Sequence, residues 1–359
     1  MHTLALSNQK GGCGKTTSAI NIAASLAGLG HRTLLVDLDP QAHATFGLGI
    51  QSEKLEHSMY NVLTARGDRK KEFIEDVLVP VQENLDLAPA HVLLSIIEQE
   101  FTNKEEGVSR LRDVLASVSF PYAFVVIDCP PSLGFLTFNA LRAADTVIVP
   151  IEMSSFSLMG VGKLLSMIEL IRVKLEHSPR VFALSTMVDM RTRFARHMDR
   201  EVRRAFGDRI LNRTVAQAIA VRESQAKGAP LGVYAPRSKS ALEYLELTKE
   251  ILGRIGPSAG EGGRTNGRAA ALSERLKDFS LEAGGAKEVY LVGDFNNWCL
   301  SNTSLLWRTE DGRWQKRLHL EPGRYRYKFV IDGHWVTDPS NDHLEPNPYG
   351  GVDSVLEID

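Results

Sequence analysis

The sequence predicts an α/β domain with a largely parallel sheet, followed by a small all-β sandwich. In about the first 250 residues, short β-branched runs alternate with longer helical stretches, a pattern typical of parallel strands joined by crossover helices. All four tryptophans lie between Trp298 and Trp335, where strand-like runs are separated by turn signals. Between the two parts, residues 256–267 read GPSAGEGGRTNG, a composition typical of a flexible linker.

The composition is that of an ordinary globular protein, with 359 residues of which 43% are hydrophobic and 24% charged. No run approaches the roughly 20 apolar residues of a membrane helix, and no basic-then-apolar segment marks a signal peptide. Three scattered cysteines, Cys13, Cys129 and Cys299, are too few for a disulfide framework or a zinc site. We therefore expect a cytoplasmic protein without a membrane partner.

The predicted parallel strands are apolar at consecutive positions, as expected when helices cover both faces of a sheet. They comprise residues 3–7, 33–37, 85–88, 124–128, 146–150 and 181–186. Helical patterns lie between them, for example over residues 17–29 and 241–255. We place the α/β domain at residues 1–253, the linker at 254–277 with a short helix over 268–277, and the sandwich at 278–359.

The last part of the chain follows a different pattern. Its strand-like runs cover residues 278–283, 288–293, 313–319, 324–331 and 353–358, and Gly- or Pro-containing turns separate them. In the run from Tyr325 to Phe329, aromatic and basic residues alternate with a period of two. Such alternation indicates antiparallel strands with one buried face.

A glycine-rich loop lies between the first predicted strand and the first helix. Its glycines let backbone N–H groups converge on phosphate oxygens, and the helix N-terminus adds a positive dipole. Lys15 can reach the β- and γ-phosphates, and the Thr16 hydroxyl can bind Mg²⁺. The common GxxxxGK[ST] pattern fails, because Gln9 stands at the place of the first Gly. The predicted ATP-binding residues are Lys10, Gly11, Gly12, Cys13, Gly14, Lys15, Thr16 and Thr17.

This deviant loop resembles that of the ParA/MinD family of ATPases, and the resemblance covers about residues 1–253. The matching pieces read NQKGG at 8–12, LVDLDPQ at 35–41, VIDCPPSLG at 126–134 and YAPRSK at 234–239. The resemblance implies a P-loop NTPase fold, hydrolysis of ATP with Mg²⁺, and a homodimer in the ATP-bound state. Cys13 lies at the unconstrained position of the loop, and we interpret it as incidental.

The family resemblance also implies roles for individual residues. Lys10 would cross the dimer interface to contact the partner's nucleotide, and Asp39 would orient the attacking water. Asp128 would serve Mg²⁺ through water, with Asp37 close to the metal. Phosphoryl transfer to water needs positive charge at the γ-phosphate and a carboxylate that places the nucleophile, so the chemistry agrees. The predicted catalytic residues are thus Lys10, Lys15 and Asp39, and the predicted metal-site residues are Thr16, Asp37 and Asp128.

A basic stretch at residues 189–213 is a candidate DNA surface. An arginine-rich helix can neutralise phosphates without reading base sequence. In ParA proteins the ATP dimer binds non-specific DNA through arginines of this region and of the segment after it; Arg191 matches one such position. Ala220 occupies a second, where Arg222 is a substitute shifted by two residues. A solvated charged helix is the alternative interpretation. The arginines of the stretch are residues 191, 193, 196, 200, 203, 204, 209 and 213.

Residues 278–359 resemble the glycogen-binding module of the AMP-activated kinase β subunit, an early-set, Ig-like sandwich. The resemblance rests on VYLVGDFNNW at 289–298, GRYRYKFVIDGHW at 323–335 and VDSVL at 352–356. It implies sugar contacts by Trp298, Lys328 and Trp335. Indole faces suit the apolar faces of glucose rings, and an ammonium donates to hydroxyls.

Three positions of this module depart from the family. Gly351 and Asp353 stand where the family has Thr and Asn, and Tyr349 replaces a leucine that threads the sugar ring, although an aromatic there can still stack. The alternative to an α-glucan-binding module is therefore a protein-interaction sandwich in which the tryptophans are structural.

Together these features predict a ParA-type ATP hydrolase that switches by ATP-dependent dimerisation. It would position or partition a cargo, either DNA on the nucleoid or a glucan- or protein-associated body, and a ParB-like protein would stimulate it. MinD-like membrane binding is not expected, because a C-terminal amphipathic helix is absent. One alternative is an ATP-dependent metabolic regulator or sensor that binds glucan without segregating DNA. Another is a metabolic enzyme with the same loop, a dethiobiotin-synthetase-like ligase or a nitrogenase-iron-protein-like reductase.

Overall fold

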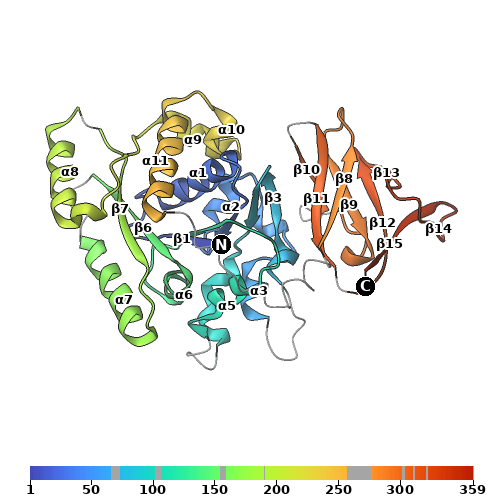
Figure 1. Cartoon of the computed structure of the whole chain (residues 1–359), viewed down its shortest axis with the longest axis horizontal. Helices are drawn as coiled ribbons and strands as arrows, with labels where there is room; N and C mark the ends of the chain where they lie inside the picture. Colours follow the sequence, from blue (N-terminus) through green and yellow to red (C-terminus); the bar gives the residue numbers. More distant parts are fainter. Residues whose placement is uncertain are drawn as a thin grey trace.

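A seven-stranded sheet forms the centre of the N-terminal domain, in the order β3-β4-β2-β5-β1-β6-β7 (Figure 1). The computed structural model describes residues 1–65, 73–101, 107–153, 159–189, 191–256, 276–300, 304–309, 312–320 and 322–358. The strands of this sheet are β1 (His2–Leu6), β2 (Thr33–Asp37), β3 (Val79–Gln82), β4 (Leu85–Ala88), β5 (Phe124–Asp128), β6 (Thr146–Glu152) and β7 (Arg180–Thr186). All six predicted parallel strands are present, with ends shifted by at most two residues.

The sequence pattern missed β3, which pairs antiparallel with β4 at the edge of the sheet. It is short and contains Pro80, which cannot donate to a ladder and is tolerated only at an edge. The other strand pairs of this sheet are parallel, including β2 with β5 in the register that places Asp37 beside Asp128. The predicted fold class, a largely parallel sheet, is therefore confirmed.

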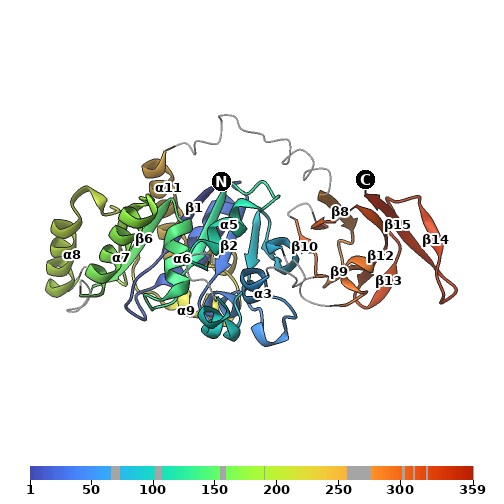
Figure 2. The same ribbon diagram turned by 90° about the horizontal axis from the view of Figure 1, so that it is seen from below.

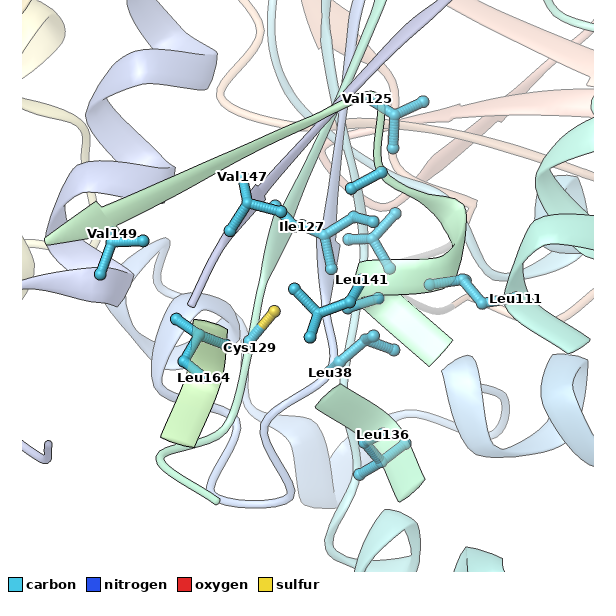
Figure 3. Close-up of a cluster of buried hydrophobic side chains, with 14 of the residues drawn as sticks. Leu38, Leu111, Val125, Ile127, Cys129, Leu136, Leu141, Val147, Val149 and Leu164 are labelled. Carbon is cyan, nitrogen blue, oxygen red and sulfur yellow. The ribbon is translucent and has the colours of Figure 1, made fainter. Parts of the chain in front are cut away.

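Helices cover both faces of this sheet, which explains the consecutive apolar residues of the strands (Figures 1 and 2). Leu4 and Leu6 point into the core formed with α1 and α11, whereas Ala5 joins the core on the opposite face. Figure 3 shows part of this second core, in which the Cys129 side chain packs among leucines and valines of β5, β6 and α6.

The helices of the N-terminal domain follow the predicted alternation with strands. The α-helices are α1 (Lys15–Gly28), α2 (His43–Gly47), α3 (Met59–Thr64), α5 (Arg110–Ala116), α6 (Phe135–Ala143), α7 (Met159–Leu175), α8 (Arg193–Phe206), α9 (Ile219–Ala226), α10 (Leu231–Tyr234) and α11 (Lys239–Ile255). Short 3-10 helices are η1 (Ser52–Lys54), η2 (Ile74–Val77), η3 (Val92–Glu100) and η4 (Gly207–Arg209). Among the described residues, no helix combines the length and the apolar character that a membrane crossing requires.

The C-terminal module is an antiparallel sandwich of two sheets. One sheet has the order β10-β11-β8, and the other has the order β13-β12-β15-β14 with β9 also paired to β12. The elements are β8 (Leu276–Glu282), β9 (Val289–Gly293), η5 (Asp294–Asn296), β10 (Trp307–Arg308), β11 (Arg313–His319), β12 (Gly323–Ile331), β13 (His334–Val336), β14 (Leu344–Pro346) and β15 (Val352–Ile358). Phe279, Trp314 and Phe329 are buried between the sheets.

The two domains are joined between α11 and β8. The α11 helix continues to Ile255, where Gly256 follows with a φ of 74°. The helix predicted over 268–277 is wrong at its last two residues, because Leu276 and Lys277 pair in β8 with β11. The rest of that predicted helix, and residues 257–267 of the predicted linker, lie outside the described residues.

The module lies against the edge of the N-terminal sheet. Its β10 strand packs beside β3, and β11 packs beside η2. Figures 1 and 2 show the three-stranded sheet on the side of the N-terminal domain and the β12–β15 sheet facing away from it. The outer face of the module is therefore open to other molecules.

Candidate functional site

The loop between β1 and α1 has the backbone of a phosphate cradle. Gly12 and Gly14 have φ values of 73° and 85°, in the left-handed region that favours glycine, and Gly14 directly precedes α1. The Thr186 hydroxyl, at the end of β7, donates to the Cys13 carbonyl at 2.8 Å and fixes the loop to the sheet. Burial raises the pKa of the Cys13 thiol, which fits an incidental residue rather than a redox centre.

Two lysines of the loop lie in different places. Lys15 is 7% exposed, and its ammonium donates to the Lys10 carbonyl at 3.0 Å, beneath the loop. The Lys10 ammonium instead lies 2.5 Å from a carboxylate oxygen of Glu152, at the end of β6. The structure thus brings Lys15 to the cradle, whereas Lys10 extends away from it along the neighbouring strand.

Two fully buried carboxylates meet where β2 and β5 end, but they have different surroundings. Asp37 Oδ2 accepts from the Thr45 amide at 2.9 Å and the Thr45 hydroxyl at 2.7 Å, and its Oδ1 accepts from the Asp39 amide at 3.1 Å. Neither carboxylate oxygen of Asp128 has a hydrogen-bond partner in the part of the chain that the structure describes. A buried carboxylate without a partner is costly, so Asp128 is the orphan of the site.

The electrostatics of this pair favour a bound cation. Burial raises the pKa of Asp37 to about 6, and bonds from Thr45 oppose the rise. Burial raises the pKa of Asp128 well above its ordinary value, Asp37 raises it further, and Thr16 opposes both effects. Oxygen donors of this kind suit Mg²⁺, so the residues present fit that ion. Asp39 lies two residues after Asp37 and is 5% exposed. Its Oδ1 accepts from the Gln41 amide at 3.0 Å.

Because the carboxylates prefer their protonated form, we expect Mg²⁺–nucleotide binding to release protons. Raised pKa values mean that the empty protein loses stability as pH rises from about 4 through 6, and that metal binding weakens as pH falls through the same range. Calorimetry in two buffers of different ionisation enthalpy measures the released protons.

Asp128→Asn is expected to raise the thermal midpoint of the empty protein by a few degrees at pH 7, because burial of this carboxyl group opposes the ionised form that the unfolded chain adopts, whereas an amide does not ionise. The same variant should weaken Mg²⁺-dependent nucleotide binding about 10–100-fold and release fewer protons. Asp113→Asn, an exposed carboxylate on α5, is the control. A lowered midpoint, or unchanged proton release, would contradict a buried Asp128 that is protonated and without a hydrogen-bond partner in the empty site.

Sequence reasoning missed an apolar cavity of about 180 Å³ beside the loop. Thr17 lines it together with Val215, Val221 and Tyr244, which come from separate segments of the chain. No sequence signal pointed to it, because its walls meet only when α11 packs beside α1 and Gln225 of α9 donates to the Thr17 hydroxyl at 3.0 Å. A flat apolar group next to bound phosphates would fit such a cavity.

The candidate DNA residues lie around one groove. Arg191 and Arg222 both line it, together with Lys239, and its volume is about 770 Å³. However, Asp189 accepts two bonds of 2.8 Å from the Arg191 guanidinium, which neutralises part of its charge. Ala220, on α9 with Arg222, is half-buried and packs against the core. On α8, ion pairs join Arg203 to Asp199 and Arg204 to Glu201.

The candidate sugar residues gather on the outer face of the β12–β15 sheet. The Trp298 and Trp335 rings lie 6.2 Å apart with their planes tilted by 34°, and Trp335 is 49% exposed. Lys328, on β12, pairs with Asp353 across to β15 at 3.2 Å. Tyr349 is 94% exposed in the loop before β15. Sequence reasoning did not foresee the Lys328–Asp353 ion pair, which occupies one donor of the ammonium.

A glycine-rich loop on a parallel sheet, with carboxylates at the ends of the neighbouring strands, defines a P-loop nucleotide-binding domain. Residues 1–180 match the family model of an AAA domain, and residues 279–359 match that of the glycogen recognition site of AMP-activated protein kinase. The sporulation initiation inhibitor protein Soj of Bacillus subtilis is 38% identical over 69% of this chain and 97% of its own length. The chain belongs to the ParA/Soj family of P-loop ATPases and carries a C-terminal module of the glycogen-recognition type.

A second relative and two solved structures are also similar to this chain. The chromosome partitioning protein ParA of Myxococcus xanthus is 38% identical over 71% of this chain and 89% of that protein. The structure of cobyrinic acid a,c-diamide synthase from Mycobacterium smegmatis, with bound ADP and magnesium, matches with a TM-score of 0.59, 32% identity, and coverage of 74% and 100% of the two chains. A putative plasmid partition protein from Borrelia burgdorferi bound to AMPPNP has the same fold, with a TM-score of 0.61, 23% identity, and coverage of 71% and 99%.

Proposed function

We propose that the chain hydrolyses ATP, dimerises when ATP is bound, and uses its C-terminal module to hold an α-glucan, so that the switch positions a glucan-associated cargo. The observation that carries this proposal is the paired indoles of Trp298 and Trp335 on the open outer face of a module fused to a partitioning ATPase. A protein that segregates DNA alone has no evident use for such a face.

In this proposal the loop amides and Lys15 hold the ATP phosphates, and the apolar cavity beside Thr17 takes the adenine ring. Thr16 and Asp128, whose carboxylate has no hydrogen-bond partner among the described residues, would hold Mg²⁺, and the bound ion would neutralise phosphate charge. Asp39 orients the water, because its carboxylate is held at the end of β2 by the Gln41 amide. Lys10 leaves Glu152 and reaches the partner's nucleotide, so dimerisation depends on ATP in both protomers.

ATP should strengthen retention on insoluble glucan. A dimer carries two modules, and bivalent attachment raises the apparent affinity about 10²–10⁴-fold when both modules can engage. Sedimentation of the full chain with insoluble starch, in Mg²⁺–ATP and in Mg²⁺–ADP, measures the difference. Lys15→Ala, which cannot hold the nucleotide, is the control and should sediment equally in both. Equal retention of the wild type in ATP and ADP would favour the sensor alternative over a dimerising switch.

DNA is a second candidate partner, favoured by the joint placement of Arg191 and Arg222 around one groove. If this groove is a DNA surface, a dimer held in ATP should bind non-specific duplex at low salt and lose most of that affinity between about 50 and 200 mM salt. Arg191→Ala and Arg222→Ala should each weaken the complex in a gel shift. Arg172→Ala, an exposed arginine on α7 paired with Glu169, is the matched control. No shift at low salt would exclude DNA as the matrix. The proposal that a ParB-like protein stimulates hydrolysis does not depend on this result.

A further inference from the structure

A buried lysine lies where the two domains meet. Lys316, on β11, is 4% exposed, and its ammonium donates to the Leu305 carbonyl at 3.2 Å. It lines a cavity of about 110 Å³ whose other walls come from both domains. The N-terminal domain contributes Glu75, Asp76 and Asp86 to this cavity, whereas the described module residues that line it include no carboxylate.

The counter-charges of Lys316 therefore belong to the other domain. Burial lowers the pKa of Lys316 to about 8, and the carboxylate of Asp86 opposes this shift. Asp86 is itself held in place, because the Tyr122 hydroxyl donates to it at 2.6 Å and Arg32 lies at 3.8 Å. A buried ammonium whose counter-charges lie on the other domain is compensated only while the two domain surfaces remain in contact.

One short segment, residues 293–299, joins the interdomain cavity to the indole of Trp298 that is the candidate sugar contact. Phe295 and Asn296 line the interdomain cavity, and Trp298 follows two residues later. The Cys299 thiol lies 3.9 Å from a carboxylate oxygen of Glu56 in the N-terminal domain. One side of this segment thus contacts the ATPase domain, while the other side presents Trp298 to Trp335.

This segment is held firmly by its own bonds. Asn296 accepts from the Gly293 amide at 2.9 Å and donates to the Leu291 carbonyl at 3.2 Å. The Trp298 indole donates to Asp294 at 3.0 Å. A Cβ at Gly293 would lie 2.4 Å from the Arg326 carbonyl, so no other residue fits there. A displacement at one side of so tight a segment is therefore transmitted to the other side.

The docked module leaves the nucleotide site uncovered. Arg32 and Phe120 line the interdomain cavity just before β2 and β5, and Asp86 lies near the start of β4. The phosphate loop and Asp128 lie at the opposite ends of the parallel strands. Docking is therefore compatible with an ATP-bound dimer, and its loss should leave the ATPase rate unchanged.

We infer that the module docks on the ATPase domain through Lys316 and its facing carboxylates, and that residues 293–299 link this docking to sugar binding at Trp298. The sugar half of the inference rests on the proposed function; the docking half does not. The coupling between two binding equilibria is reciprocal. If bound sugar changes the docking equilibrium constant by some factor, then loss of docking must change the affinity for the sugar by the same factor.

Cys299 is a native reporter of docking. Cys13 and Cys129 are buried, so a thiol reagent added to the folded full chain reacts with Cys299 first. Lys316→Glu places a carboxylate among carboxylates and should accelerate labelling of Cys299 at least about fivefold. Lys287→Glu makes the same charge change at an exposed turn and should have no effect. ATPase rate and far-UV circular dichroism should be unchanged in both variants.

A second variant separates undocking from misfolding of the module. Glu75→Lys places a cation opposite Lys316 from the other domain and leaves the module sequence intact. A comparable acceleration of Cys299 labelling in Glu75→Lys supports the docking inference even where Lys316→Glu fails to fold. Wild-type labelling rates in both charge-reversal variants would overturn it.

Titration with a soluble α-1,4-linked oligosaccharide tests the link to sugar. Lys316→Glu should change the sugar affinity at least about fivefold, whereas Lys287→Glu should keep the wild-type value. Equal affinity in all three proteins would overturn the link while leaving glucan binding established. Absence of binding to any of them would overturn the glucan function, and the labelling experiment would still decide the docking.

Discussion

Asp39→Ala is expected to leave ATP binding intact, to lower turnover at least about 10²–10³-fold, and to trap the dimer. The substitution removes the carboxylate that would place the attacking water, but it does not touch the glycine loop, Lys15 or Asp128. Asp39 lies two residues beyond Asp37, the last residue of β2, and its amide donates to the Asp37 carboxylate. Its side chain is 5% exposed and accepts from the Gln41 amide, so its orientation is set by the fold. Steady-state ATPase rates, together with sizing chromatography in ATP, measure both effects.

Two companion variants separate the steps of the switch. Lys15→Ala should lose nucleotide binding altogether, because the ammonium lies beneath the phosphate cradle. Lys10→Ala should still bind ATP but remain a monomer, because its ammonium extends away from its own cradle. Asp208→Ala, in η4, changes an exposed carboxylate far from the loop and should behave as wild type. Unchanged turnover in Asp39→Ala would refute the role assigned to that residue.

Trp335→Ala is expected to release the full chain from insoluble glycogen or starch. An indole that is 49% exposed beside a second indole offers a flat apolar surface, and stacking on it dominates recognition of a sugar's apolar face. We expect Trp298→Ala to act in the same direction, with a loss of about 10-fold or more for each variant. A pull-down followed by quantification of the supernatant measures retention.

Polar contacts should matter less than the indoles in this module. The Lys328 ammonium already donates to Asp353, and Asn347 donates to the same carboxylate at 2.8 Å. Loss of a single hydrogen bond costs only about 0.5–1.5 kcal/mol, so the departures at Gly351 and Asp353 should weaken binding without abolishing it. Tyr234→Ala, an exposed aromatic of the ATPase domain, is the control. Wild type and Trp335→Ala remaining equally in the supernatant would mean that the module binds protein rather than glucan.

Much of the nucleotide site could be predicted from sequence, because its parts are local. The loop requires glycines at fixed spacing between a strand and a helix, and the structure places Gly12 and Gly14 in left-handed conformations there. The strands that carry Asp37 and Asp128 were predicted with the correct bounds. The difference between these two carboxylates could not be predicted, because Thr45 reaches Asp37 only after α2 has packed beside β2.

The surface sites depended more on neighbours that the sequence does not reveal. The spacing of Arg191 and Arg222 gave no sign that they share a groove, nor that Asp189 neutralises the first of them. Trp298 and Trp335 of the outer face were predicted from the family resemblance, because Trp298 follows η5 rather than lying in a strand whose alternation could place it. The Lys328–Asp353 pair was not, because it depends on the register between β12 and β15.

The two-part organisation, the phosphate loop and the parallel strands could be read from the sequence, because helical and strand periodicity and glycine spacing are properties of short segments. Three features appear only in the folded chain: Asp128 has no hydrogen-bond partner among the described residues, an apolar cavity adjoins the loop, and Lys316 is buried in a cavity that carboxylates of the other domain also line. In each case the deciding groups come from elements distant in sequence, and burial and charge depend on which surfaces meet in the folded chain.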